Sequence, residues 1–526
     1  MLADLAWIPR GVAKTKLPED VDGNEDMDVS GNSDQEDDND MLADTNRDED
    51  ESEAVDVSEV LANDLDNLSF YKKGERDPHL SSGPKANKIF DEEELEDLTI
   101  QSTDAVVISV HSGEDVSLLM THVFDDNPDE SDDESNSYVP HTYIHHDIVL
   151  PTLPLCAAHT SLQVNDDVVN LVAVGMFTPG IEVWDIDQVN NLEPVASLGG
   201  YGASSVVKDA LAAANKVRAG GSRKRKKKPQ LKLRDGSHTD AVMSLSWNST
   251  QREYLASGSA DHTVKVWDIE SAHCASTFSH HDGKVQAVAF HPSEAELLLT
   301  GSFDKTVQVL DVRDPGKKGK WSVNADVETC AWGHGQLSNV VITTTEDGYV
   351  SVFDSRMAGK DASPLSRWQA HKGAVSSCAV SRDIPGLMVT GSVDKQIKVW
   401  DISRVGSEEV ESIYQRPSKA GAVFALSLCP LPDSETNASP FVIAYGGSKG
   451  SLGVIDLAVE SEAVRERFMY HCGAAAAKVI KKRSERRAFV TDRAQSKRSK
   501  QIRNGGQKDP DSEPENSSDN SRTDDD

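Results

Sequence analysis

The stretch SGSADHTVKVWDI, residues 257–269, decides the fold class of this chain. Small residues that suit a β-strand are followed by the turn Ala260-Asp261-His262. Residues 263–267 then alternate in period two before Asp268 ends the run. The stretch therefore predicts a strand, a tight turn and a second strand.

The same pattern returns along the chain as TGSFDKTVQVLDV (300–312), TTTEDGYVSVFDS (343–355) and TGSVDKQIKVWDI (390–402), with weaker copies at 172–186 and 444–457. The turn aspartates of the four clear copies are 43, 43 and 47 residues apart. A period of about 40–45 residues with a terminal Trp-Asp is the signature of WD-repeat blades. The sequence therefore predicts an all-β, seven-bladed WD-repeat β-propeller.

A histidine precedes several copies at a fixed distance and begins an alternating strand, as in HTDAVMSLSW (238–247) and HKGAVSSCAV (371–380). In such blades a His, a strand Ser or Thr, the turn Asp and the strand Trp form a buried hydrogen-bonded set. Two complete sets are expected: His238, Ser257, Asp261, Trp267, and His371, Thr390, Asp394, Trp400. A buried aspartate needs such partners, so we interpret these His-Asp pairs as structural and not as a proton relay or metal site.

The remaining blades show departures from this pattern. Leu310 and Phe353 stand where the fourth and fifth blades would carry Trp, and the fifth has no leading His. We expect these blades to depend on packing alone. The dipeptides His145-His146 and His280-His281 suggest metal ligands, but adjacent residues of a strand point to opposite faces, which excludes a shared ion.

The net charge of −34 is concentrated in three acidic runs. Residues 19–66 carry −20, residues 91–97 carry −6 and residues 125–134 carry −7. The first run has too few apolar residues to form a core. Residues 1–15 match the first strand of a blade, so we expect a disordered acidic insertion at 16–99 inside the first blade.

Two basic segments complete the chain. A loop insertion at 200–236 carries six consecutive bases, Arg223, Lys224, Arg225, Lys226, Lys227 and Lys228, which predict a nuclear-import signal or nucleic-acid patch, with a solvated loop as the alternative. The propeller is expected over 100–468. A disordered tail is expected over 469–526, first basic and then acidic, and its basic part is a second import or RNA-contact candidate.

Composition excludes several classes of protein. Six cysteines without a CxxC pair indicate reduced thiols inside a cell. The sequence opens with no secretory signal and contains no run of 18 apolar residues, so we expect neither secretion nor membrane insertion. There is no P-loop, nucleophile elbow, HExxH or metal-spaced Cys/His set, so neither an enzyme nor a cofactor is predicted.

Longer stretches resemble one family. AWIPRGVAK (6–14), HHDIVLPTLPL (145–155), IEVWDIDQVNNLEPV (181–195) followed by the basic loop, and HTDAVMSLSWN (238–248) are similar to the periodic tryptophan protein 1 family, as is HPSEAELLLTGSFDKTVQVLDVR (291–313). The resemblance covers most of residues 1–15 and 100–457. It implies a nuclear and nucleolar factor of ribosome biogenesis, active in ribosomal RNA transcription or processing and in large-subunit assembly.

Two functions follow as expectations. The first is a non-enzymatic nucleolar scaffold that works as a monomer within larger complexes and binds preribosomal assembly factors, ribosomal proteins or chromatin, with RNA contacted through the basic loop and tail. The second is an acidic chaperone for a basic ribosomal protein or histone. Ser33, Ser131 and Ser512 each have an acid three residues later, which suits an acidophilic casein-type kinase.

Overall fold

The computed structural model describes residues 1–14, 99–101, 103–113, 116–125, 141–164, 167–189, 191–202, 232–314, 316, 318–357, 363–406, 409–431, 438–485 and 487. The basic run 223–228, the candidate phosphorylation sites Ser33, Ser131 and Ser512, and the acidic segment 19–66 lie outside these residues. Among the described helices, none has the length and apolar character needed to cross a bilayer.

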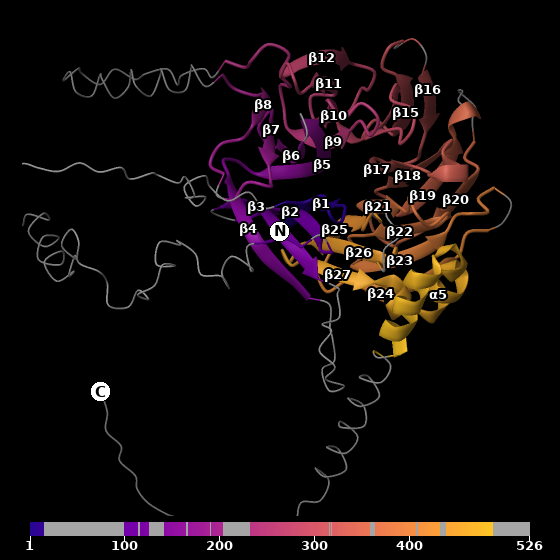
Figure 1. Cartoon of the computed structure of the whole chain (residues 1–526). Coiled ribbons are helices and arrows are strands. Elements are labelled where there is room, and N and C mark those ends of the chain that lie inside the picture. Colours follow the sequence, from indigo (N-terminus) through magenta and orange to yellow (C-terminus); the bar gives the residue numbers. More distant parts are fainter. Residues whose placement is uncertain are drawn as a thin grey trace, which may run out of the picture. The chain divides into compact units, whose positions relative to one another are not determined.

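Seven antiparallel sheets form a seven-bladed β-propeller, as the repeats predict (Figure 1). Blade 1 contains β1 (Leu2–Ile8), β2 (Ala105–Ser112), β3 (Ser117–Asp125) and β4 (His141–Leu150). Blade 2 contains β5 (Pro154–Val164), β6 (Asp167–Met176), β7 (Gly180–Asp185) and β8 (Ala196–Gly199). Blade 3 contains β9 (Val242–Trp247), β10 (Tyr254–Ser259), β11 (Val264–Asp268) and β12 (His273–Phe278).

The regular repeats form the next blades. Blade 4 contains β13 (Val285–Phe290), β14 (Leu297–Ser302), β15 (Thr306–Asp311) and β16 (Lys318–Ser322). Blade 5 contains β17 (Val327–Trp332), β18 (Val340–Thr345), β19 (Tyr349–Asp354) and β20 (Ser366–Gln369), with short 3-10 helices η2 (Gly335–Leu337) and η3 (Ser355–Met357). Blade 6 contains β21 (Ser377–Val380), β22 (Leu387–Gly391), β23 (Gln396–Asp401) and β24 (Ser412–Pro417).

The seventh sheet has three described strands, β25 (Val423–Leu428), β26 (Val442–Gly447) and β27 (Gly453–Asp456). Helices α4 (Leu457–Glu460) and α5 (Glu462–Phe468), the 3-10 turn η4 (Met469–His471) and a helix over 474–485 follow it. The disordered tail expected from residue 469 is wrong for residues 469–485. Ile480 is fully buried in the core of blades 6 and 7, and this apolar contact stabilises the helix.

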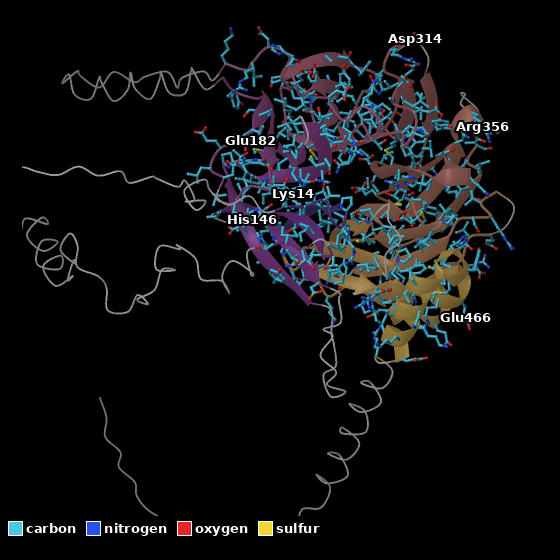
Figure 2. All side chains as sticks on the ribbon, viewed as in Figure 1. Lys14, His146, Glu182, Asp314, Arg356 and Glu466 are labelled. Carbon is cyan, nitrogen blue, oxygen red and sulfur yellow. The ribbon has the colours of Figure 1, made fainter. Side chains whose placement is uncertain are left out.

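The ring closes through its innermost strands. Each of them contacts the next around the ring, from β1 and β5 through to β25 and β1. Buried apolar residues fill each junction, and side chains occupy the space between the ribbons (Figure 2). We call the rim at which the innermost strands begin the upper rim; it also carries the turns that hold Asp261 and Asp394.

Hydrogen bonds from indole groups connect neighbouring blades at three of these junctions. Trp247 Nε1 donates to the carbonyl of Ala158 in the preceding blade at 2.9 Å, and Trp332 donates to Ala289 at 3.0 Å. Trp7 Nε1 donates to the carbonyl of Ser427 at 3.2 Å, across the junction where the first and seventh blades meet. The beginning of the propeller sequence is therefore held against its end by side chains, while β1 itself pairs with β2.

Candidate functional site

The two predicted polar sets are brought together by the structure. In blade 3, the indole Nε1–H of Trp267 donates to Ser257 Oγ at 2.8 Å, and this hydroxyl lies 2.7 Å from His238 Nε2. His238 Nδ1 lies 2.9 Å from an Asp261 carboxylate oxygen. All hydrogen-bonding atoms of this neutral imidazole are therefore engaged inside the blade.

Blade 6 repeats the arrangement. Trp400 Nε1 donates to Thr390 Oγ1 at 2.9 Å, and Thr390 Oγ1 lies 2.8 Å from His371 Nε2. His371 Nδ1 lies 3.1 Å from Asp394 Oδ2. The two sets have the same connections although their hydroxyl residues differ, because either hydroxyl accepts from the indole and donates to the imidazole.

Burial and hydrogen bonds together set the pKa values of His238 and Asp261 in blade 3. It lowers the pKa of His238 by more than the hydrogen bond to Asp261 raises it. Burial raises the pKa of Asp261, but the hydrogen bonds from His238, Thr263 and the Thr239 amide together hold it well below its usual range. At neutral pH the pair is a neutral imidazole that donates to a carboxylate.

The expectation that blade 4 depends on packing alone is wrong. His281 Nδ1 lies 2.9 Å from Asp304 Oδ2, and His281 Nε2 lies 2.9 Å from Thr300 Oγ1. Only the indole is replaced, by the buried Leu310. The hydrogen-bonded set therefore tolerates loss of its tryptophan because the three other members still satisfy one another.

The geometric argument against the histidine pairs is also wrong. His145 Nδ1 lies 2.8 Å from His146 Nδ1, because the β3–β4 register shifts beside His145 and removes the alternation of faces. His280 and His281 precede β13 in a loop, and both lie within 3.0 Å of Thr300 Oγ1. Within the described part of the chain, no group of three or more His, Cys, Asp or Glu residues could hold a metal ion.

Sequence reasoning missed a side-chain donor eight residues after the hydroxyl member of the sets in blades 4 and 6. Lys398 Nζ donates to the carbonyl of Ala370 at 2.7 Å, and Gln308 Nε2 donates to the carbonyl of His280 at 3.0 Å. Each acceptor immediately precedes the histidine of its set. A polar residue in an otherwise apolar strand at this fixed position was the signal available in the sequence.

A second missed site lies where residues 12–14 meet blade 2. The buried Asp187 carboxylate accepts from Asn170 Nδ2 at 2.9 Å and from the Lys14 amide at 3.1 Å. Asn170 Nδ2 also donates to the carbonyl of Val12 at 2.9 Å. On the other side of segment 15–98, Arg10 Nη1 donates to the carbonyl of Thr103. These contacts hold the chain in blades 1 and 2 on both sides of the acidic run.

Exposed apolar side chains are concentrated in the same two blades. Eleven of the fifteen large hydrophobic residues that are exposed among the described residues belong to blades 1 and 2. We define the apolar rim as five of these residues at the upper rim: Val149 near the end of β4, and Val116, Leu153, Phe177 and Tyr201 in the segments that join the strands. The Phe177 amide donates to the Leu153 carbonyl at 2.8 Å, which extends the pairing of β5 and β6 within blade 2 to this rim.

The basic loop also starts from this rim. Tyr201 and Leu233 form a β-bridge, and the Gly202 amide donates to the Lys232 carbonyl at 3.1 Å. The two described ends of the loop are therefore paired. The chain therefore leaves the described structure after residue 202 and re-enters it at residue 232 at the upper rim of blade 2.

Comparison with known proteins agrees with this architecture. The family model "WD domain, G-beta repeat" matches residues 228–268, 272–311 and 362–401. An uncharacterized WD repeat-containing protein of Schizosaccharomyces pombe is 35% identical over 428 residues, which cover 80% of this chain and 73% of that protein.

Two further relatives carry more informative names. Periodic tryptophan protein 1 of Saccharomyces cerevisiae is 35% identical over 243 residues, covering 42% of this chain and 39% of the yeast protein. The ribosome biogenesis protein WDR12 homolog of Trichoplax adhaerens is 54% identical over 39 residues, covering 7% of this chain and 9% of that protein. With the strand at residues 2–8, the seven blades and these similarities established, the chain belongs to the periodic tryptophan protein 1 family of WD-repeat proteins.

Proposed function

We propose that this chain is a non-enzymatic scaffold in nucleolar ribosome biogenesis, where it contributes to ribosomal RNA transcription or processing and to large-subunit assembly by binding proteins. Membership of the periodic tryptophan protein 1 family supports this role, as does the name of the ribosome biogenesis relative. The partner class is the preribosomal assembly proteins. Fold alone does not select this function, because propellers serve many functions.

The apolar rim is the observation that carries the proposal. Phe177 is 62% exposed and Val149 is 65% exposed, and both lie on a rigid ring edge. Exposed apolar side chains that are concentrated in one region of a protein surface are typical of protein interaction sites. We therefore assign the protein contact to the upper rim of blades 1 and 2.

The polar sets support a non-enzymatic role. Both imidazole nitrogens of His238 and of His371 are engaged by partners within their own blades, and each histidine is almost fully buried. A general base must reach the proton that it removes from a substrate. The hydrogen bonds of these histidines stabilise their own blades instead.

The test is affinity purification of the full chain at moderate salt, followed by quantitative identification of bound proteins. The rim variant Val149→Ser/Phe177→Ser should lose the assembly proteins that the wild type retains, with an unchanged melting temperature. The matched control is Val164→Ser/Leu192→Ser, two exposed apolar residues of blade 2 at the lower rim. Equal recovery of partners by wild type and rim variant would contradict the proposal.

A second candidate function, an acidic chaperone for a basic ribosomal protein or histone, is favoured by the contacts that hold residues 10–14 and 101–104. They tether both sides of a segment that carries −20 between residues 19 and 66. A tethered polyanion attracts basic clients, and salt screens the attraction beyond about 8 Å at physiological ionic strength.

Deletion of residues 20–66 separates the two functions. A chaperone would lose one stoichiometric basic client, and added salt would cause the same loss in the wild type, whereas the scaffold would keep its assembly proteins.

The nuclear and nucleolar localisation has a test of its own. Neutral replacement of residues 223–228 together with the bases of residues 481–500 should leave the protein in the cytoplasm. Nuclear accumulation of that variant would show that neither run is the import signal.

Phosphorylation is the proposed form of regulation. Phosphate at Ser33, Ser131 and Ser512 would each add about −1.5 to −2 to segments that are already acidic. Phosphopeptide mapping from growing cells tests this, and three unmodified serines would contradict it.

A further inference from the structure

The helical segment that follows blade 7 has one face attached to the propeller. Val464 and Phe468 of α5 and Ile480 of the helix over 474–485 are buried in the core shared by blades 6 and 7. Figure 1 shows α5 beside β24, the outermost strand of blade 6, and Figure 2 labels Glu466 on this segment. The segment is therefore a fixed part of the ring surface.

The arginines of this helical segment form ion pairs and hydrogen bonds that hold it on the propeller. Arg467 Nη2 lies 2.5 Å from Asp401 at the end of β23, and Arg487 Nη2 lies 2.8 Å from Glu460. Glu460 also forms an ion pair with Arg416 of β24, with 2.8 Å between Glu460 Oε2 and Arg416 Nη1. Arg465 Nη1 donates to the carbonyl of Ala458 at 2.6 Å. These guanidinium groups are directed to groups of the segment and the propeller.

Its lysines are arranged differently. Lys478, Lys481 and Lys482 are exposed and occupy positions i, i+3 and i+4 of one helix, opposite the buried Ala476 and Ile480. Their ammonium groups make no hydrogen bond or ion pair with any described residue. Glu485 is the acidic residue on the same face. Three ammonium groups are thus presented to solvent on a rigid helix.

An exposed aromatic residue lies in the 3-10 turn that precedes this helix. Tyr470 is 75% exposed, the most exposed of the large aromatic residues among the described residues, and its ring contacts His471 with centroids 3.9 Å apart and ring planes inclined at 38°. An aromatic side chain that is left in water provides a π-face on which a nucleobase can stack.

We propose that Tyr470, Lys478, Lys481 and Lys482 form a docking surface for single-stranded RNA. Three free ammonium groups attract the phosphates, and the exposed ring adds base stacking, a contact that an acidic polypeptide cannot make. The surface lies on blades 6 and 7, so it is separate from the apolar rim of blades 1 and 2. The inference deepens the proposed function by adding RNA as a second partner class, but it depends on different residues.

The test is fluorescence anisotropy of a labelled oligouridine with the full chain, titrated at several salt concentrations. The variant Lys478→Gln/Lys481→Gln/Lys482→Gln should raise Kd by about tenfold or more at low salt. It should also reduce the slope of log K against log salt by about 2, which corresponds to three lost phosphate contacts on a single strand. Tyr470→Ala should raise Kd by roughly fivefold or more while leaving the salt slope unchanged.

The matched control is Lys284→Gln/Lys372→Gln/Lys449→Gln, which removes the same charge from exposed lysines of blades 4, 6 and 7 at the upper rim. This control should bind oligouridine like the wild type. Equal weakening by both triple variants, or no weakening by either, would overturn the proposal. A further result would also overturn the proposal. If polyglutamate binds the wild type and Tyr470→Ala equally well and fully displaces oligouridine, the occupant of this surface is an acidic polypeptide. Neither result would change partner recovery by the rim variant, so failure here is distinguishable from failure of the proposed function.

Discussion

At the scale of single residues, the polar sets are stability devices. In blade 3 the order of donation runs from Trp267 through Ser257 to His238, and then from His238 to Asp261. Each group satisfies the next in a place where an unpaired polar atom would be costly. The residues of both complete sets were predictable from spacing alone, because each set repeats the same four positions.

The first prediction concerns this chain of hydrogen bonds. Trp267→Ala should lower the free energy of unfolding by roughly 3–5 kcal/mol, because it removes a fully buried indole. Ser257→Ala should cost about 1–3 kcal/mol, because it leaves the indole N–H and the His238 nitrogen unpaired. Chemical denaturation measures both values. A wild-type midpoint for Trp267→Ala would show that the indole is not part of the core.

The second prediction concerns pH. Burial raises the pKa of Asp4 to about 6, against the hydrogen bonds from the Ala157 and Leu5 amides, which lower it. A raised pKa means that the folded chain holds a proton that the unfolded chain has released. The resulting stabilisation is complete below about pH 4 and is lost as the pH rises through 6.

Asp4→Asn removes this titration. The free energy of unfolding of the variant minus that of the wild type should therefore increase by about 2 kcal/mol between pH 4 and pH 7. The substitution by an amide adds a constant to this difference at every pH and does not affect the change. Denaturant midpoints at several pH values measure the difference, which cancels the titration of the buried histidines. A difference that does not change with pH would place Asp4 in water.

At the scale of elements, the turns between second and third strands of the blades follow one design. The residue after the turn aspartate has a positive φ in His262, Lys305 and Lys395, with φ of 63–69°, and Gly348 occupies the same position in blade 5 with φ of 86°. The turn was predictable from its aspartate. The left-handed backbone was not, because three of its four occupants are not glycine.

The third prediction uses this turn. Lys395→Gly should stabilise the protein by a few tenths to about 1 kcal/mol, because glycine adopts the positive φ without strain. Gly348→Ala should destabilise by more than 1 kcal/mol, since a Cβ there would lie 2.3 Å from the His371 carbonyl oxygen. Thermal unfolding compares both with wild type. A stabilising Gly348→Ala would refute the turn geometry.

Some elements were beyond the sequence for identifiable reasons. The bulge beside His145 depends on the register of β3 against β4, which an alternating pattern does not encode. The helix over 474–485 is rich in alanine and lysine, and what makes it part of the fold is burial of Ile480 against blades 6 and 7. The missed Asn170–Asp187 site also includes the carbonyl of Val12, which is far away in the sequence, so no local motif predicts the site.

At the scale of the whole molecule, ring closure depends on side chains. Trp7 donates across the junction of blades 7 and 1 and meets Phe124 edge to face, with centroids 6.2 Å apart. The strand at residues 2–8 and the count of seven blades were predictable because the strand pattern of β1 matches those of the regular blades. The side-chain contact that closes the ring was not predictable, because Trp7 and Ser427 are 420 residues apart in the sequence.

The fourth prediction tests this closure. Trp7→Phe keeps most of the apolar contact but removes the donor to Ser427, and should cost about 1–3 kcal/mol. Hydrogen exchange should rise in β1 and β25 together, because this junction joins the two ends of the propeller sequence. Trp247→Phe, which removes the equivalent bond to Ala158, is the control and should leave exchange in β25 unchanged. Exchange confined to β1 would contradict closure through Trp7.

In the proposed function, the apolar rim of blades 1 and 2 carries the contacts for large-subunit assembly. The most direct measurement is depletion of the endogenous protein, rescue with wild type, the Val149→Ser/Phe177→Ser variant or the Val164→Ser/Leu192→Ser control, and quantification of large-subunit precursors by gradient sedimentation. Wild type and control should restore the precursors, whereas the rim variant, although folded and expressed equally, should not. Full rescue by the rim variant, or unchanged large-subunit precursors after depletion, would contradict the account.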